Sequence, residues 1–236
     1  MKILGFESSA KSAGVALMED GVLLAEAFQN TGLTHSATLL PMAQDLLSRC
    51  NLQVSDVSVV AVANGPGSFT GLRIGLAAAK GLAWGREVPV LGVSTLEAMA
   101  YGILPFRGII VACMDARRNE VYNAIFESDG ETITRLSPDR AISVEELKKE
   151  LESYEKEKIL VGDGAQLCYN TFCGLPSVHL APAHRRFQHA AGVVLAAKAQ
   201  LEQGNFPSNE ELSLNYLRLS QAERERAEKL KQKGEV

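Results

Sequence analysis

Short apolar runs and helical repeats alternate along the first hundred residues. Three brief apolar runs at the start, separated by small polar residues and by the Glu19-Asp20-Gly21 turn, predict three consecutive strands. Apolar residues then recur at helical spacing behind Ser36, a residue type that favours the N-cap position. A β-branched run, a glycine-rich loop and further repeats follow. The predicted elements are strands 3–6, 14–18, 22–28, 57–63 and 88–93 and helices 36–49, 70–84 and 95–102.

The second hundred residues repeat this order more weakly. Strands are predicted at 109–114, 120–127, 132–136 and 159–161, and helices at 144–154, capped by Ser143, and at 190–203. The pattern is that of a duplicated α/β fold with two βββαβα halves. We divide the chain into an N-terminal half, 1–104, and a C-terminal half, 105–220. The charged tail, 221–236, has almost no apolar residues, which predicts a solvated helix or a segment without fixed structure.

Composition limits the class of protein. At 236 residues, with 46% hydrophobic and 22% charged residues, the chain can bury a core of its own. Its net charge of −4 gives no general reason to bind nucleic acid. The four cysteines form no metal-ligand spacing and indicate a reducing compartment. An acid at position 7 interrupts any signal peptide, and the longest apolar run, 57–63, is too short to span a bilayer. We therefore expect a cytoplasmic protein with no membrane contact.

The most informative stretch is a glycine-rich loop, 64–70, that opens a helix. It is not a Walker A loop, because no Gly-Lys-Ser/Thr follows at the required distance. The helix carries Gly71, Gly75 and Gly81, and each glycine costs roughly 1 kcal/mol relative to alanine. Something therefore requires a thin helix with a close backbone approach. Two interpretations stay open: tight packing on the sheet, or contact with a helix of another protein.

Candidate polar chemistry is sparse. The first hairpin places Glu7, Ser8 and Ser9 at a turn between strands, which is where actin-like and sugar-kinase folds hold phosphates and magnesium; turns are also rich in serine for local reasons. Acids at later turns, Asp115 and Asp163 among them, stay open as general acid–base candidates.

The histidines suggest no metal site. His179, His184 and His189 recur every five residues, which turns successive side chains by about 140° on a helix and alternates them between the faces of a strand. Neither arrangement brings the three imidazoles together. We therefore predict no metal ligands.

Several segments together resemble a known family. They are residues 3–9, His35-Ser36 followed by Leu39-Leu40-Pro41, and above all residues 64–75 with 79–83; residues 115–122 and 215–218 are similar to further family segments. These segments resemble the TsaB (YeaZ) family of bacterial tRNA threonylcarbamoyladenosine biosynthesis proteins. The resemblance is strong over residues 1–100 and loose afterwards.

The resemblance implies an ASKHA fold (the actin, Hsp70 and sugar-kinase superfamily) with two ribonuclease H-like halves. It also implies a partner, TsaD, which binds a metal and a nucleotide and transfers threonylcarbamoyl to adenosine 37 of tRNA. The ATPase TsaE would be the third component, and tRNA would be met only through the complex. The chain would be a homodimer when alone. No cofactor of its own is expected; ATP or ADP and a metal are expected on the partner.

The same comparison implies that the catalytic constellation is absent. Thr95 and Met99 stand where the two metal-binding histidines of TsaD would be, and neither suits such an ion. Lys11 and Ser12 replace the acids that follow the first turn of TsaD. A vestigial nucleotide site would consist of Glu7, Ser8 and Ser9.

By resemblance, the docking surface for TsaD is formed by helices 36–49 and 70–84, whose apolar residues exceed one buried stripe. A bulky residue at Gly75 is expected to abolish the heterodimer. The predicted docking residues are Leu39, Leu40, Met42, Ala43, Leu46, Leu47, Gly71, Ile74, Gly75, Ala78 and Leu82.

Two other functions stay open. An autonomous ASKHA-fold enzyme, either a small-molecule kinase or a metal-dependent hydrolase, would need phosphate hairpins in both halves and a catalytic acid. Only Glu7 and the turn at 162–164 offer anything of this kind. An interaction module with unrelated partners is the third possibility.

Overall fold

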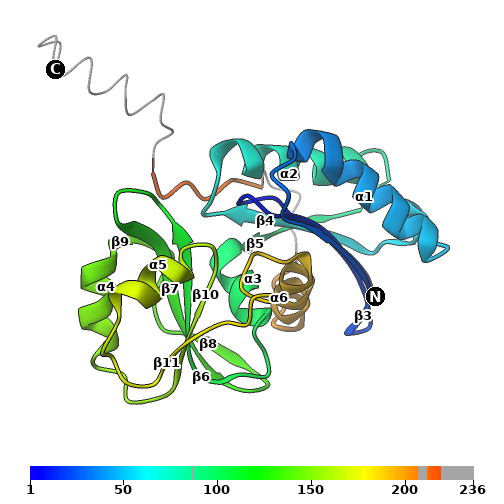
Figure 1. The fold of residues 1–236 in the computed structure, drawn as a ribbon. Coiled ribbons are helices and arrows are strands. Elements are labelled where there is room, and N and C mark those ends of the chain that lie inside the picture. The colour runs from blue at the N-terminus through cyan, green and yellow to red at the C-terminus, as the bar shows by residue number, and fades with distance from the viewer. Residues whose placement is uncertain (87, 207–211, 219–236) are drawn as a thin grey trace, which may run out of the picture.

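Two β-sheets with helices on their faces form the computed structural model, which describes residues 1–86, 88–206 and 212–218 (Figure 1). The first sheet has the order β3-β2-β1-β4-β5, in which β1 is antiparallel to β2 and parallel to β4. Its strands are β1 (Lys2–Glu7), β2 (Ala13–Glu19), β3 (Val22–Gln29), β4 (Val59–Gly65) and β5 (Val90–Ser94). The helices of this part of the chain are α1 (His35–Arg49), α2 (Phe69–Ala83), α3 (Thr95–Tyr101) and the short 3-10 helix η1 (Val54–Asp56).

The second sheet repeats the first. Its order, β11-β10-β6-β7-β8, reads in reverse as the same path, with β6 in the place of β1 and β10 in the place of β4, while β9 pairs with β7. The strands are β6 (Arg107–Asp115), β7 (Glu120–Asp129), β8 (Ile133–Arg135), β9 (Arg140–Ser143), β10 (Lys158–Val161) and β11 (Val178–Leu180). The helices are α4 (Val144–Leu151), α5 (Ala165–Thr171) and α6 (Ala190–Glu202). The predicted duplication is confirmed.

The central strand β1 is buried from Ile3 onward because helices cover both faces of its sheet. On one face, Leu4 and Phe6 join the core beneath α1 and α2. On the other face, Ile3 packs against Val193 and neighbouring residues of α6. Because successive side chains of a strand point to opposite faces of the sheet, β1 contributes residues to two cores, one on each face.

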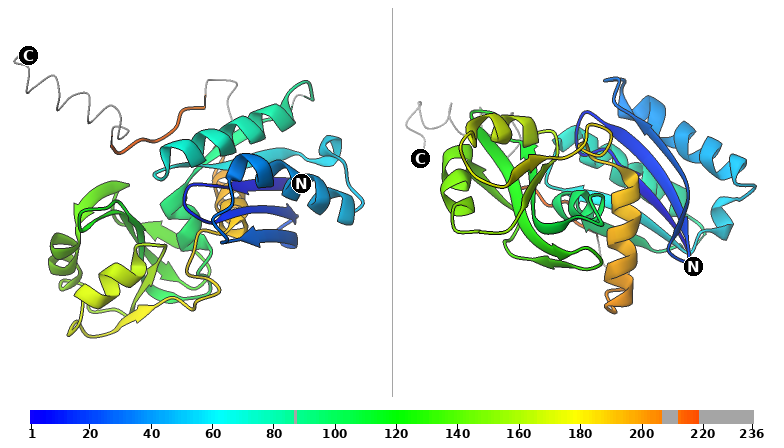
Figure 2. Two further views of the ribbon diagram at one scale, coloured as in Figure 1. Left: turned by 45° about the horizontal axis from the view of Figure 1, so that its top comes forward. Right: turned by 60° about the horizontal axis from the view of Figure 1, so that its bottom comes forward.

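The last helix of each half packs on the sheet of the other half. Leu96 and Met99 of α3 lie in the core of the second sheet, with Phe126 of β7. In return, α6 lies on the first sheet, and Figure 2 shows it between the two halves. The helices meet where Gly192 faces Ala98, because a methyl group at Gly192 would overlap the Ala98 carbonyl oxygen. The two halves therefore share their cores.

This exchange corrects the predicted division of the chain. A C-terminal half of 105–220 would include α6, yet α6 belongs to the core of the first sheet. Residues 212–218 also return to the N-terminal half, because Asn215 N donates a hydrogen bond to Asn64 O, 2.8 Å away. The predicted tail, 221–236, lies outside the described residues.

Most predicted helices and strands are present, with shifted ends. The helix predicted from Ser36 begins at His35 behind Thr34, and α2 begins at Phe69, behind Ser68, whose Oγ accepts a hydrogen bond from Gly71 N. The helix predicted to end at residue 154 ends at Leu151. Four short elements, η1, β9, α5 and β11, were not predicted. Within the described residues, no helix combines the length and apolar character that crossing a membrane requires.

Candidate functional site

The turn after β1 is clamped against the first turns of α2. Ser8 Oγ donates a hydrogen bond to Gly71 O at 2.9 Å, and Ser68 N donates to Ser9 O at 2.6 Å. A methyl group at Gly71 would overlap the Ser8 carbonyl oxygen, and one at Gly75 would overlap Ser8 Oγ. The close contacts of Gly71 and Gly75 therefore support tight packing within the protein, the first of the two interpretations of this glycine-rich helix.

Gly81, in the last turn of α2, differs from them. No atom of the described residues lies within 4 Å of the position that its Cβ would occupy, and the residue is exposed. Internal packing does not explain this glycine, so the second interpretation, contact with another protein, stays open for this end of the helix.

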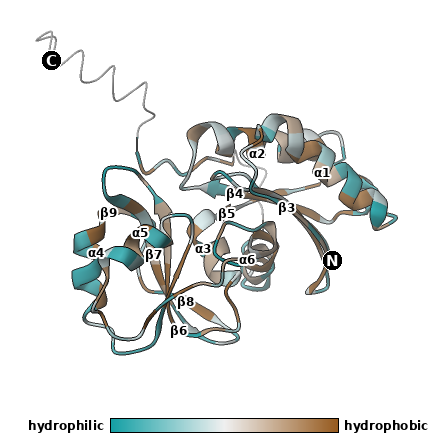
Figure 3. Ribbon diagram, viewed as in Figure 1, coloured by the Kyte–Doolittle hydropathy of each residue, from teal (hydrophilic) through white to brown (hydrophobic). Residues whose placement is uncertain are grey.

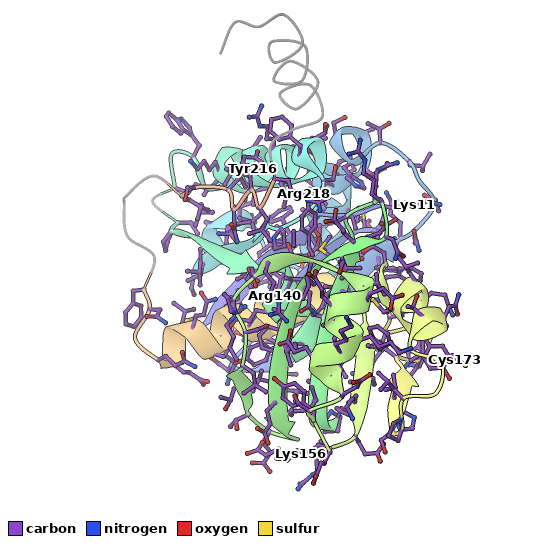
Figure 4. The ribbon with its side chains drawn as sticks, turned by 90° about the vertical axis from the view of Figure 1, so that its left-hand side faces the viewer. Lys11, Arg140, Lys156, Cys173, Tyr216 and Arg218 are labelled. Carbon is purple, nitrogen blue, oxygen red and sulfur yellow. The ribbon has the colours of Figure 1, made fainter. Side chains whose placement is uncertain are left out.

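Next to the clamped turn, a cavity of about 610 Å³ lies between the two halves. Figure 4 views the molecule from the side on which Lys11, Tyr216 and Arg218 lie, between α2 and the second sheet. Its walls come from the β1–β2 turn, the first residues of α2, the β6–β7 turn and the end of the described chain. The lining residues are Ser9, Ala10, Lys11, Gly67, Ser68, Phe69, Thr70, Met114, Asp115, Ala116, Arg117, Tyr122, Asp163, Tyr216 and Arg218.

Two acids near this cleft have raised pKa values: Asp163 lines the cavity, and Glu7 is buried next to Ser9, which lines it. Glu7 is only 1% exposed, and burial raises its pKa to about 7, against the opposing effect of the hydrogen bond from Ser9 N to Glu7 Oε1 at 2.6 Å. Glu7 Oε2 and Ser9 Oγ are buried and have no hydrogen-bond partner in the described part of the chain. Asp163 lines the cavity, and desolvation by the surrounding protein raises its pKa, although Gln188 Nε2 donates to it at 2.7 Å.

The three residues of the predicted vestigial nucleotide site thus have different surroundings. Ser9 lines the cavity, Glu7 lies behind the wall, and the Ser8 hydroxyl is engaged by α2. Asp115 ends β6 as Glu7 ends β1, but it is exposed, and its Oδ1 accepts a hydrogen bond from Arg117 N at 2.7 Å. The cleft therefore brings Ser9, Asp115 and Asp163 to one cavity.

The three spaced histidines do not meet in one place, but His184 and His189 line the same cavity, which their spacing did not predict. His179 pairs with Glu157, and His189 lies 3.3 Å from Glu26 and stacks on Phe28. His35 Nε2 contacts Ala10 O at 2.8 Å, beside the clamped turn. Among the residues that the structure describes, no three His, Cys, Asp or Glu side chains are placed to hold a metal ion.

Sequence reasoning missed the role of residues 212–218, which we name the C-terminal strap. Leu212 packs into the core beneath α1 and α2, Tyr216 reaches Arg73 of α2, and Arg218 reaches the β6–β7 turn. The strap has no regular periodicity, so only the similarity of residues 215–218 to the family drew attention to it.

Comparison with known proteins decides the family. A family model described as TsaD, tRNA N6-adenosine threonylcarbamoyltransferase, matches residues 29–223. Relatives from Bacillus subtilis strain 168 (32% identical, covering 71% of this chain and 73% of the relative) and Escherichia coli K12 (37%, covering 70% and 73%) are named tRNA threonylcarbamoyladenosine biosynthesis protein TsaB. The chain belongs to the TsaB (YeaZ) family. A solved Pseudomonas aeruginosa protein described as similar to peptidase YeaZ is 25% identical, covers 92% of this chain and 99% of its own, and superposes with a TM-score of 0.77.

Membership of the TsaB family confirms the predicted ASKHA fold, since the duplicated sheets match the YeaZ-like structure over nearly its whole length. The positions that the resemblance equates with the metal-binding histidines of TsaD lie in α3. Thr95 is fully buried, and its Oγ1 has no hydrogen-bond partner among the residues that the structure describes; Met99 is 3% exposed in the core of the second sheet. Lys11 is exposed and lines the cavity, while Ser12 Oγ donates to Gln188 O at 3.2 Å.

The structure corrects much of the docking surface predicted for this TsaB-family chain. Most of the predicted residues fill the protein's own core, so they are not available to a partner in this conformation. The buried ones are Leu39, Ala43, Leu46 and Leu47 of α1 and Gly71, Gly75 and Ala78 of α2. Leu40 is 40% exposed, and Met42, Ile74 and Leu82 are partly exposed. Since Gly75 faces Ser8, a bulky residue there would test folding and not docking.

Proposed function

We propose that this chain is a non-catalytic subunit of a tRNA threonylcarbamoyladenosine modification complex that docks onto a TsaD-type partner and supports it. The observation that carries the proposal is the similarity to proteins named for this pathway, at 32% and 37% identity over about 70% of the chain. The packing of α3 supports the non-catalytic part, because Met99 has an apolar environment in place of a metal-binding one.

The proposed docking surface is the outer face of α1 and α2. Its apolar part consists of Leu40 and Ile74, and Ala77 and Gly81 lie on the same exposed side of α2. Small residues let a second helix approach closely, and partly exposed aliphatic side chains supply area to bury. In this proposal the same face pairs two copies of the chain when the partner is missing.

The division of labour in the complex follows the resemblance. TsaD would hold the metal and the nucleotide, TsaE would be the third component, and tRNA would be met through the assembly. This chain would contribute surface and no cofactor.

Gly81 offers a clean test of docking. A side chain there enters open space, and arginine has a higher helix propensity than glycine, so Gly81→Arg is expected to fold at least as well as the parent. The same side chain would stand between closely packed helices. We expect size-exclusion chromatography with light scattering to show a heterodimer with the TsaD-type paralogue for the parent and none for Gly81→Arg.

A matched control introduces the same side chain elsewhere. Glu145 is exposed on α4 in the other half, so Glu145→Arg is expected to keep the heterodimer. Retention of the complex by Gly81→Arg would show that the partner binds elsewhere. Lack of any complex with the parent protein would contradict the proposed function itself, whereas reconstituted tRNA modification that depends on this chain would support it.

The cavity supports a second candidate, an autonomous enzyme of the ASKHA class. Asp163 lines it, and Glu7, with its pKa of about 7, lies immediately behind the wall. The burial of Glu7 argues against this candidate, since a general base must reach its substrate. ATP hydrolysis by the isolated chain at an ordinary enzymatic rate, lost in Glu7→Ala, would establish it.

A further inference from the structure

The C-terminal strap lies in a seat formed by two glycines of the first sheet. A side chain at Gly65, which has φ +121°, would overlap the Asn215 carbonyl oxygen. At Gly92 a Cβ would lie 2.5 Å from Leu212 Cδ1. Asn215 N then completes the contact by donating to the Asn64 carbonyl oxygen at 2.8 Å. A larger residue at Gly65 would displace the backbone of the strap, whereas one at Gly92 would push aside the Leu212 side chain and the Asn64 amide, which lies 2.8 Å from the same Cβ position. The two glycines therefore leave room for the strap.

The strap next contacts the first turns of α2. Arg73 Nε donates to the Tyr216 hydroxyl at 3.1 Å. The Tyr216 ring packs on Phe69 with centroids 5.0 Å apart, and the Arg73 guanidinium lies 3.8 Å from the Phe69 centroid. The Tyr216–Phe69 contact joins the strap to α2, and the Arg73–Phe69 contact orients the guanidinium within that helix. The strap is therefore attached to the helix whose other end carries Gly81.

The end of the strap grips the second half. Arg218 Nη1 donates to Ala116 O at 2.9 Å, and Arg218 forms an ion pair with Glu120. Both partners flank the tight β6–β7 turn, where three successive residues, 117–119, have φ values of 63°, 57° and 59°. Such conformations are uncommon outside glycine and persist where surrounding contacts fix them. The strap is one of those contacts.

Several contacts join the halves. They include the exchange of α3 and α6 between the cores, the hydrogen bonds from Ser94 Oγ to Asp139 Oδ2 at 2.7 Å and from Ser12 Oγ to Gln188 O at 3.2 Å, and the strap, which Figure 1 shows crossing from β4 and α2 towards the second sheet. Tyr216 and Arg218 also form part of the wall of the cavity between the halves. Release of the strap would remove part of the wall of this cavity together with the contacts that the strap makes to both halves.

We propose that the C-terminal strap is a latch that holds the two halves closed over the cleft and ties that closure to the position of α2. The second part rests on the proposed function, which assigns the outer face of α2 to the partner. Coupling between two sites is reciprocal. If a partner on α2 binds more tightly when the strap is in place, the bound partner in turn stabilises the strap in that position. A partner on α2 and a closed cleft would therefore stabilise each other.

The first test measures closure on the chain alone. Spin labels at exposed Gln44 on α1 and Glu145 on α4, with Cys50 and Cys173 replaced by serine, report the distance between the halves. Tyr216→Ala combined with Arg218→Ala is expected to lengthen and broaden the distance distribution in pulsed electron resonance. Ser213→Ala, an exposed position of the same strap, is the matched control and is expected to leave it unchanged.

A second variant, Gly92→Val, changes the sheet beneath the strap and leaves the strap sequence intact. It is expected to broaden the distance distribution in the same way. Circular dichroism melting confirms that each variant is folded. A distribution identical to the parent in both the double variant and Gly92→Val would overturn the latch.

The second test measures coupling. The double variant is expected to bind the TsaD-type partner at least 5-fold more weakly than Ser213→Ala does, a typical coupling strength. If the double variant opens the halves but binds the partner as tightly as Ser213→Ala does, the proposed coupling between closure and the partner surface on α2 is wrong. If the parent protein binds no such partner, the proposed function fails, and the distance measurement still decides the latch by itself.

Discussion

The two halves share one topology and differ in the helices on their outer faces. In the N-terminal half, α1 and α2 each have 15 residues, whereas their counterparts α4 and α5 have 8 and 7. Charged residues dominate α4, which is largely teal in Figure 3. Among the described residues, exposed large apolar side chains gather in the N-terminal half, at Val22, Leu23, Leu24, Phe28, Leu33, Leu40 and Trp84. The duplicated sheets define the fold. Of the exposed apolar residues named, four lie on β3 and one, Leu40, lies on α1, so the apolar surface of the N-terminal half includes its outer strand as well as a helix.

The ends of the equivalent strands β1 and β6 show the same divergence. Glu7 is sealed behind the cavity with a pKa near 7, while Asp115 stays exposed and accepts a hydrogen bond within its own hairpin. Equivalent positions in a duplicated fold thus carry acids with different surroundings, one buried and one exposed. The comparison of the halves can be tested at the level of the cores, of these acids and of the α2 glycines.

The largest expected effect comes from the shared cores. Phe6 and Phe126 are fully buried, one in each half, and replacing either by alanine is expected to cost about 3–5 kcal/mol of unfolding free energy. Because α3 and α6 each pack on the other half's sheet, both variants should shift a single transition. Urea denaturation followed by circular dichroism, with hydrogen exchange resolved by half, measures this. Loss of protection confined to the mutated half would show that the halves unfold independently.

The next effect is the pH dependence of stability, which is expected to differ between Glu7 and Asp115. Since burial raises the pKa of Glu7 to about 7 from 4.5, the folded protein keeps a proton between these values that the unfolded chain has released. Stability therefore falls as pH rises through that window. Glu7→Gln removes the effect and is expected to exceed the parent by about 3 kcal/mol at pH 8 and to match it near pH 4. Urea titrations at pH 4 to 8 measure the difference, and Asp115→Asn, at an exposed site, is the control. A constant difference across the range would contradict the assignment.

The sequence predicted the order of most elements because a strand buried on both faces, such as β4, reads as a continuous apolar run. It did not predict β9 and β11, which have 4 and 3 residues, although β8 and β10 are equally short and were predicted, β10 from its apolar run of Ile159, Leu160 and Val161. The placement of α6 also escaped it, since an apolar helix shows that it is buried and not which sheet covers it.

The candidate site shows the same limit. An apolar stripe that fills the protein's own core has the same spacing as one that meets a partner, so Leu39 and Leu46 were assigned to docking although they are buried. The contacts of the strap join residues far apart in sequence, such as Arg218 and Ala116, and no local pattern encodes them. Glu7 was identified because its hairpin is local, but its burial depends on the whole fold.

The smallest expected effect is the difference in stability change between alanine substitutions at two glycines of α2. Gly71→Ala must displace the backbone of Ser8, so it is expected to lose about 1–3 kcal/mol even though alanine favours the helix. Gly81→Ala meets nothing within 4 Å and is expected to gain about 1 kcal/mol. Chemical denaturation of the two variants measures both signs. Equal effects at the two positions would mean that helix propensity alone governs them, and that neither the clamp on Ser8 nor the open space at Gly81 shapes α2. If Gly71→Ala lowers the unfolding free energy and Gly81→Ala raises it, Gly81 reduces the stability of the monomer without a packing role in it. A glycine of this kind is expected where a helix of a partner approaches closely.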